Sequence, residues 1–197
     1  MEEKQLVFAV QSFQEGLNSN PNHQGLRFGL NAVNQLIKSA VDINAEGVNL
    51  YQSGKFVLAL NKFEKAIEIN PTVPNYHYNK AGALIKLTDY NAALQANEKY
   101  LERDKTGSKG YAQKGLIYLA LKQNQNAKNA FEEGLRYDPQ NEECRNGLRD
   151  MNGGTKNVDD LAALLLLGAL LENQRPQRPD PQVFFLNRPG FNSNLFF

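Results

Sequence analysis

The residues of this sequence best suited to bind a charged ligand are a few amides and one lysine. They are Asn44, Asn79, Lys109 and Gln113, with the apolar Val48 among them. A lysine ammonium and amide groups that converge from neighbouring helices can hold a carboxylate through charge-assisted hydrogen bonds. Side chains of these types could bind a carboxylate of a peptide. The alternative is that they are ordinary solvated or helix-capping residues.

The motifs that usually carry catalysis are missing from this sequence. It has no Gly-rich phosphate loop before a helix, no His-x-x-x-His or Cys-x-x-Cys pair and no Gly-x-Ser-x-Gly. The two histidines, His23 and His77, lie far apart in sequence, and Cys144 has no second cysteine with which to bind a metal or form a disulfide. We therefore predict a protein that is not an enzyme, with no cofactor and no metal site.

Composition and charge exclude several classes of partner. The 197 residues are 41% apolar and carry a net charge of +1, without the basic excess that nucleic-acid binding requires. The start, Met1-Glu2-Glu3-Lys4, does not resemble a signal peptide, and no apolar run reaches the ~20 residues of a membrane span. A single cysteine fits a reducing compartment, so we expect a cytoplasmic protein whose partners are proteins.

A small residue, an aromatic, a second small residue and a proline recur as a pattern along the chain. The pattern occurs at Ala59, Phe63, Ala66 and Pro71, again 68 residues later, and in a weaker copy halfway between. A helix-turn-helix unit of about 34 residues with these positions is typical of the tetratricopeptide repeat, whose copies stack into a solenoid. The later copies are Ala93, Asn97, Tyr100 and Lys105, then Ala127, Phe131, Gly134 and Pro139. The period predicts units at about 40–73, 74–107 and 108–141, in a domain over 42–151 that includes a capping helix.

The first helix of each unit is expected to line the concave side of the solenoid. Its second, fifth, sixth and ninth positions should face the groove. These positions combine amides, one cation and some apolar surface. They are Val41, Asn44, Ala45, Val48, Asn75, Tyr78, Asn79, Gly82, Lys109, Ala112, Gln113 and Leu116.

Four segments of the repeats carry a resemblance to a known family. They are Ala66-Ile67-Glu68-Ile69-Asn70-Pro71, Tyr78-Asn79-Lys80-Ala81, Ser108-Lys109-Gly110-Tyr111 and Phe131-Glu132-Glu133-Gly134-Leu135. Through them, residues 44–150 resemble the three-repeat domains of chaperone adaptors, the Hop-like stress-inducible co-chaperones and the small glutamine-rich tetratricopeptide protein. The resemblance implies a clamp of five polar residues that binds the acidic C-terminal tail of a cytosolic heat-shock chaperone through two carboxylates.

Two of the five clamp positions keep their residue type in this sequence. By resemblance, the clamp lysines fall on Asn44 and Lys109, its asparagines on Val48 and Asn79, and its arginine on Gln113. Each charge-assisted hydrogen bond contributes about 1.5–3 kcal/mol. The loss of two cations and one amide should therefore weaken the binding of a doubly anionic tail by about a hundredfold or more. The resemblance therefore implies a degenerate clamp, in which we expect Asn79 and Lys109 to hold a single carboxylate.

Two apolar stripes at helical spacing precede the repeats. Residues 4–17 and 25–41 predict two short helices joined by a turn, which form a helical hairpin over 1–41. Leu6–Val10 and Leu36–Ala40 look similar to the homodimerisation hairpin of the small glutamine-rich protein, which implies a possible homodimer. The dimer contacts would be Leu6, Val10, Phe13, Leu30, Val33 and Ile37.

The C-terminal part combines a leucine-rich segment with an aromatic tail. Residues 157–172 predict a helix that is apolar nearly all round, either a second capping helix or one that docks in a groove of this chain or of a partner. Residues 173–197 predict an extended tail that fills pockets of a partner or folds back on its own solenoid. The docking residues would be Phe184, Phe185, Phe191, Phe196 and Phe197.

The predicted fold is all-α: an N-terminal helical hairpin, a three-repeat solenoid with capping helices, and an extended C-terminal tail. The predicted function is that of a non-catalytic adaptor, a divergent co-chaperone that binds peptide tails in its concave groove. The alternative is a structural subunit that is built into a larger multiprotein assembly through the aromatic tail. Asn79, Lys109 and the hairpin favour the adaptor, whereas the lost clamp cations, the leucine-rich helix and the tail favour the subunit.

Overall fold

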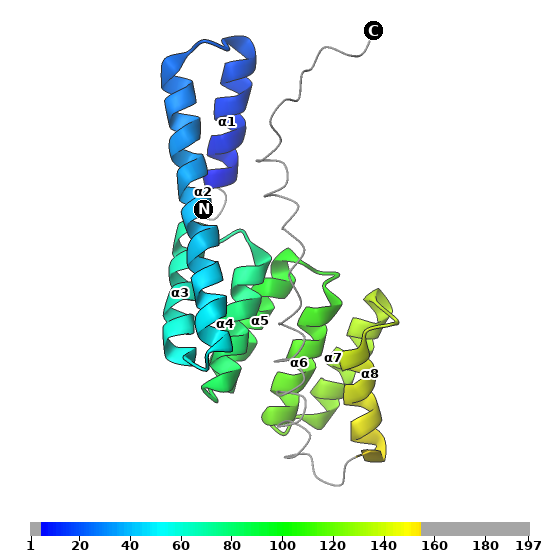
Figure 1. Ribbon diagram of the computed structural model, residues 1–197. Coiled ribbons are helices and arrows are strands. Elements are labelled where there is room, and N and C mark those ends of the chain that lie inside the picture. Colours follow the sequence, from blue (N-terminus) through cyan, green and yellow to red (C-terminus); the bar gives the residue numbers. More distant parts are fainter. Residues whose placement is uncertain (1–4, 155–197) are drawn as a thin grey trace.

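In the computed structural model, which describes residues 5–154, eight α-helices follow one another as antiparallel neighbours (Figure 1). The three helix pairs of the repeats are α2 (Gln24–Gln52) with α3 (Phe56–Ile69), α4 (Pro74–Lys86) with α5 (Tyr90–Arg103), and α6 (Ser108–Ala120) with α7 (Asn124–Tyr137). The predicted cap, α8 (Glu142–Arg149), packs on α6 and α7 and continues into a π-helical turn at Asp150–Gly154. The all-α solenoid predicted from the repeat period is confirmed.

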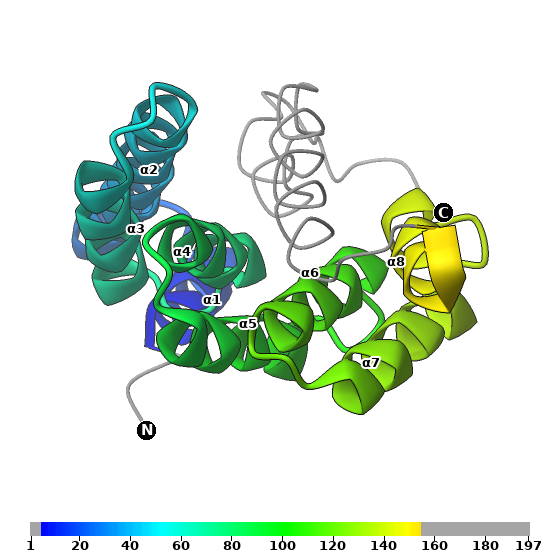
Figure 2. The same cartoon turned by 90° about the horizontal axis from the view of Figure 1, so that it is seen from below.

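The helix pairs follow an arc when they are viewed along the helices (Figure 2). Helices α2, α4, α6 and α8 lie on the inner side of this arc, and α3, α5 and α7 lie on its outer side. Each inner helix therefore faces the inner helix of the next repeat, which is the arrangement that brings side chains from different repeats together.

The core of the solenoid is built from the small and aromatic positions of the repeat pattern. Phe63 packs against Gly47, where a Cβ would lie only 2.7 Å from the ring, and Phe131 overlaps the place of a Cβ at Gly115 in the same way. The residues at the first three positions of the pattern are buried in all three repeats. The recurring geometry thus comes from a large ring on the second helix that fits against a residue without a side chain on the first.

The second repeat reverses the sizes of two core positions. Asn97 occupies the place that Phe63 and Phe131 hold in the other repeats, and Tyr100 occupies the place of a small residue. The Tyr100 ring fits because Gly110, on the first helix of the next repeat, leaves the space that a Cβ would fill. Both Asn97 and Tyr100 are fully buried.

The turn inside each repeat has one residue in the left-handed region. Gly54, Thr88 and Lys122 have φ angles of 73°, 61° and 59°, and they stand at equivalent places 34 residues apart. The residue after each of them donates its amide back to the first helix, for example from Asp89 N to Leu84 O at 3.0 Å. This is the Schellman-type end of a helix, where glycine is the preferred residue. Glycine is present only in the first of these three turns.

Helix α1 (Gln5–Ser19) packs on the first half of α2 and forms the predicted hairpin, which projects from the solenoid (Figure 1). The two short helices expected to precede the repeats differ from the structure in one respect. Residue 41, the expected end of the hairpin, lies inside α2, a single helix of 29 residues. No glycine or proline occurs between Lys38 and Glu46 to end the helix there. The hairpin and the first repeat therefore share one continuous helix.

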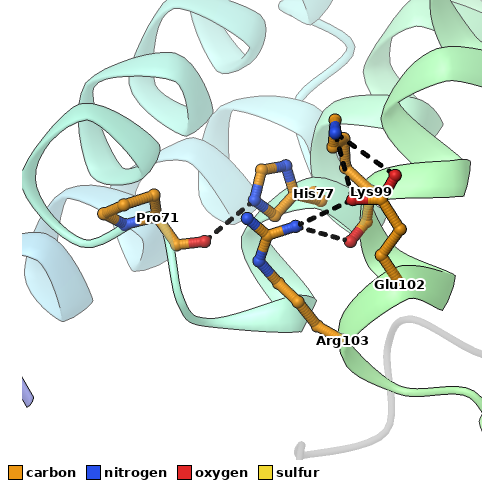
Figure 3. Close-up of polar contacts among 5 residues, drawn as sticks. All are labelled: Pro71, His77, Lys99, Glu102 and Arg103. Atoms are coloured by element: carbon orange, nitrogen blue, oxygen red, sulfur yellow. Dashed lines mark hydrogen bonds and ion pairs between the residues drawn. The ribbon is translucent and has the colours of Figure 1, made fainter. Parts of the chain in front are cut away.

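His77 stabilises the connection between the first two repeats. His77 is buried, and its Nε2 donates to the carbonyl of Pro71 at 3.1 Å. Figure 3 shows the Arg103 guanidinium of α5 beside this ring, where its Nη1 donates to Lys99 O at 3.0 Å. Lys99 in turn pairs with Glu102 on the same helix. His77 thus holds the turn after α3 to the start of α4.

Two further predictions concern parts of the chain beyond the helices just described. The leucine-rich segment 157–172 and the tail 173–197 lie outside the described residues. Within residues 5–154, none of the helices is both long and apolar enough to cross a membrane.

Candidate functional site

The candidate site is the surface that α2, α4 and α6 present on the inner side of the arc. The twelve predicted groove positions lie on these three helices, and hydrogen bonds donated by their side chains join each helix to the next. We call these residues the inner face: Val41, Asn44, Ala45, Val48, Asn75, Tyr78, Asn79, Gly82, Lys109, Ala112, Gln113 and Leu116.

Asn44 and Asn79 bind each other across α2 and α4. Asn79 Nδ2 donates to Asn44 Oδ1 at 3.0 Å, although the two residues are 35 positions apart in sequence. Only 6% of Asn79 is exposed. The amide expected to donate to a carboxylate therefore already donates to the protein. Val48, one turn along α2 from Asn44, is partly buried and packs on the core cluster around Tyr51 and Phe63.

Lys109 is held at the seam between α4 and α6. Its Nζ donates to Asn75 Oδ1 at 2.8 Å and lies 4.9 Å from the centre of the Tyr78 ring and 5.6 Å from that of Tyr100. The two rings are themselves neighbours, with centroids 5.5 Å apart. An ammonium so close to aromatic faces is stabilised by cation–π attraction. Its position is thus fixed by three side chains from two helices.

Gln113 belongs to a buried network and is 6% exposed. Its Nε2 donates to the carbonyl of Tyr78 at 3.3 Å, and its Oε1 accepts from Asn97 Nδ2 at 2.9 Å. Asn97 Nδ2 also donates to Gly110 O at 3.0 Å, whereas Asn97 Oδ1 is buried without a hydrogen-bond partner. Both polar atoms of the Gln113 side chain are therefore occupied inside the protein.

Tyr100 interacts with Lys109 through an uncharged aromatic ring. Burial and a hydrogen bond from its hydroxyl to Asp104 Oδ2, at 2.8 Å, raise the pKa of Tyr100 above its usual value. The phenol therefore stays protonated throughout the physiological range. It supplies an aromatic face and no charge to the seam.

The predicted site residues thus fall into separate groups on one surface. Asn44 with Asn79 join α2 to α4, and Lys109 with Gln113 join α4 to α6. Asn75 and Tyr78, which support Lys109, were among the predicted groove positions. Asn97 and Tyr100 were not predicted for the site, although their exception to the repeat pattern is a signal that could have found them.

Phe13, one of the predicted dimer contacts, lies in the seam of the hairpin. Phe13 packs against Gly29, where a Cβ would lie 2.5 Å from the ring, and the other five residues are half-buried. The apolar side chains that the hairpin exposes are different: Phe8, Phe28 and Leu36 are 64%, 78% and 50% exposed. They stand on α1 and α2, with Phe28 and Leu36 eight residues apart on one helical face.

The described part of the chain contains no cluster of three His, Cys, Asp or Glu side chains that could hold a metal ion. Cys144 is buried, and burial raises the pKa of its thiol to about 12. The predicted docking residues of the tail, from Phe184 to Phe197, lie outside the described residues.

Comparison with known proteins identifies the repeats. Family models of the tetratricopeptide repeat match residues 62–95 and 108–141. Among curated proteins, the chain is 27% identical over 160 residues to the Hsp70-Hsp90 organizing protein of Triticum aestivum, covering 74% of this chain and 27% of that protein. It is 28% identical over 112 residues to the small glutamine-rich tetratricopeptide repeat-containing protein 2 of Mycosarcoma maydis, covering 57% of this chain and 32% of that protein. The chain therefore spans about a quarter to a third of these relatives.

A solved structure has the same fold. The first repeat domain of Spaghetti (RPAP3), bound to the HSP90 peptide SRMEEVD, superposes with a TM-score of 0.56 at 24% identity. The match covers 58% of this chain and 91% of that domain.

Proposed function

We propose that this chain, whose residues 62–95 and 108–141 match models of the tetratricopeptide repeat, is a non-catalytic co-chaperone adaptor whose inner face binds the C-terminal peptide of a heat-shock chaperone. The observation that carries the proposal is the placement of Lys109 over Tyr78 and Tyr100, next to Asn75. A cation fixed by two aromatic rings and one amide is well suited to attract a carboxylate.

The relatives support the same class of function. Two of them are named as an Hsp70-Hsp90 organizing protein and a small glutamine-rich repeat protein, and the similar Spaghetti domain holds an HSP90 peptide. We expect this chain to act in the cytoplasm.

The test is a titration of the full chain with fluorescein-labelled SRMEEVD, followed by fluorescence anisotropy. We expect saturable binding that Lys109→Ala weakens by about tenfold or more, because one charge-assisted contact is lost. Lys128→Ala is the matched control, since Lys128 lies on the outer helix α7 and pairs only weakly with Glu132, at 3.8 Å. Absence of binding at high micromolar peptide would exclude the proposed function.

We also propose that the hairpin mediates self-association, an independent property of the same adaptor. The exposed side chains of Phe8, Phe28 and Leu36 support it, because burial of such side chains in a dimer removes apolar surface from water. Sedimentation equilibrium should detect a concentration-dependent dimer that Phe28→Ser weakens. Val57→Ser, which changes another exposed apolar residue on α3, should leave the dimer intact. A monomer at all concentrations would contradict this proposal.

A further inference from the structure

We propose that the inner face recognises one carboxylate and not two, so that its preferred peptide ends in an uncharged polar residue whose α-carboxylate is the only anionic group at that end. The inference rests on the proposed function and specifies its ligand. Three observations lead to it: the number of cations on the inner face, the contacts that occupy its amides, and the contribution of a core residue to those contacts.

The inner face has a single cation. Among its twelve residues, all within the described part of the chain, Lys109 alone carries a positive charge. A carboxylate that approaches Lys109 meets an ammonium already oriented by Asn75 and the two tyrosine rings. A second carboxylate a residue's width away would find no cation of the inner face to balance its charge, and its desolvation would not be compensated.

The amides that flank Lys109 are closed to a second carboxylate. Asn79 Nδ2 donates to Asn44 Oδ1, and Gln113 Nε2 donates to the carbonyl of Tyr78. An acidic side chain that took either donor would leave a carbonyl oxygen of the protein without that partner. A neutral amide or hydroxyl can instead donate to such an oxygen as well as accept, so it costs less to place beside these pairs.

The core of the second repeat makes this arrangement rigid. Asn97 is fully buried and donates to Gln113 Oε1 at 2.9 Å. A movement of Gln113 towards a ligand would take from Asn97 one of its acceptors, in a residue whose Oδ1 is already buried without a partner. The selectivity for one carboxylate therefore depends on Asn97, a core residue that does not contact the ligand.

The experiment compares four labelled heptapeptides on the full chain. They are SRMEEVD and SRMEEVN with free C-termini, and the same two peptides as C-terminal amides. All four share the same internal glutamates, so they differ only in the α-carboxylate and in the last side chain.

We expect SRMEEVN to bind more tightly than SRMEEVD, because the side-chain carboxylate of the last aspartate would lack a cation of the inner face to balance its charge. Amidation of SRMEEVN should weaken its binding by about tenfold or more, the loss of one charge-assisted contact. Lys109→Ala should abolish the effect of amidation, and Lys128→Ala should preserve it.

Two results would overturn the inference while leaving the proposed function in place: binding of SRMEEVD that is as tight as that of SRMEEVN or tighter, or binding that amidation does not change. A failure of all four peptides to bind would overturn the inference and the proposed function together.

Discussion

Asn97, a fully buried residue of α5, donates to Gln113 Oε1 on the inner helix α6 at 2.9 Å. This bond connects the core of the second repeat to the surface that we propose as the binding site. It exists because Asn97 replaces the phenylalanine of the other two repeats, while Tyr100 supplies the missing ring one turn later. The same Tyr100 reaches the seam under Lys109. The exchange of a large and a small residue between these two core positions therefore places both the hydrogen bond to Gln113 and the aromatic ring near Lys109.

Removal of the Asn97 amide should destabilise the chain. Asn97→Ala leaves Gln113 Oε1 without its donor and opens space in the core, so we expect a loss of about 2 kcal/mol in the free energy of unfolding. Equilibrium unfolding in urea measures it. Asn91→Ala, at an exposed position of the same helix, should change the free energy by less than about 0.5 kcal/mol. Equal stabilities of the two variants would show that the Asn97 network contributes nothing.

The sequence predicts the repeat frame well, because the frame depends on local spacing. The recurrence from Pro71 to Pro139 places the three helix pairs and their buried residues correctly. Side-chain partners are harder to predict. The bond between Asn44 and Asn79 joins residues 35 positions apart, and it depends on the distance between two helices that packing alone determines. The sequence can name the residues of the inner face without showing that they bind one another.

The shared helix α2 marks a second limit of prediction. Separate hairpin and repeat helices require a break near residue 41, and the apolar stripe alone does not say whether one occurs. The structure continues the helix through this region, where glycine and proline are missing. The end of a helix is therefore predicted more reliably from helix-breaking residues than from the expected end of a hairpin.

Glycine should stabilise the turns of the second and third repeats. Thr88 and Lys122 adopt the left-handed conformation that Gly54 adopts in the first repeat, at a cost of about 1–2 kcal/mol for residues with a side chain. Thr88→Gly and Lys122→Gly should each raise the free energy of unfolding by about 0.5–1 kcal/mol, after the larger backbone entropy of glycine in the unfolded chain is subtracted. Thermal unfolding followed by circular dichroism measures the shift.

Gly54→Ala is the reverse control for these turns. A Cβ at Gly54 would meet no atom within 4 Å, so only backbone strain changes, and the variant should be less stable by about 1 kcal/mol. If Thr88→Gly lowered the melting temperature, relief of backbone strain would not control the stability of this turn.

Two glycines of the inner helices should respond oppositely to alanine. At Gly115 a Cβ would overlap the Phe131 ring, so Gly115→Ala should cost about 1–3 kcal/mol through overpacking. At Gly82 the nearest atoms to a Cβ are 3.7 Å away or more, so Gly82→Ala should be neutral or gain up to about 1 kcal/mol in helix propensity. Urea unfolding of the two variants side by side tests the role of the glycine–phenylalanine contact. Similar losses for both would contradict it.

Cys144 should be chemically inert in the folded chain. Burial, followed by the charges of Glu143 and Asp138, raises the pKa of its thiol to about 12, so almost no reactive thiolate exists at pH 8. We expect alkylation by iodoacetamide at pH 8 to be at least about a hundredfold slower in buffer than in denaturing urea, where the pKa returns to its usual value of about 8.5. Mass spectrometry of timed samples measures both rates. Rapid modification of the folded chain would mean that α8 detaches readily from the solenoid.

Addition of cations to the inner face should create a preference for a second carboxylate. Asn44→Lys introduces an ammonium beside Asn79 and releases the Asn79 amide from its present acceptor. Gln113→Arg introduces a guanidinium at the seam, next to Lys109 and Tyr78. Because each new charge-assisted contact contributes about 1.5–3 kcal/mol, the double variant should bind SRMEEVD at least about tenfold more tightly than SRMEEVN.

The single variants separate the two contributions to that change. Gln113→Arg must displace a side chain that Asn97 holds in a buried position, so part of its gain in affinity should be lost as stability. Asn44→Lys acts at a half-buried residue and should retain nearly all of its gain. Anisotropy titrations give the affinities and urea unfolding gives the stabilities. If neither variant changed the ratio of the two affinities, the contacts of Asn44 and Gln113 could not be what sets the number of carboxylates that the inner face accepts.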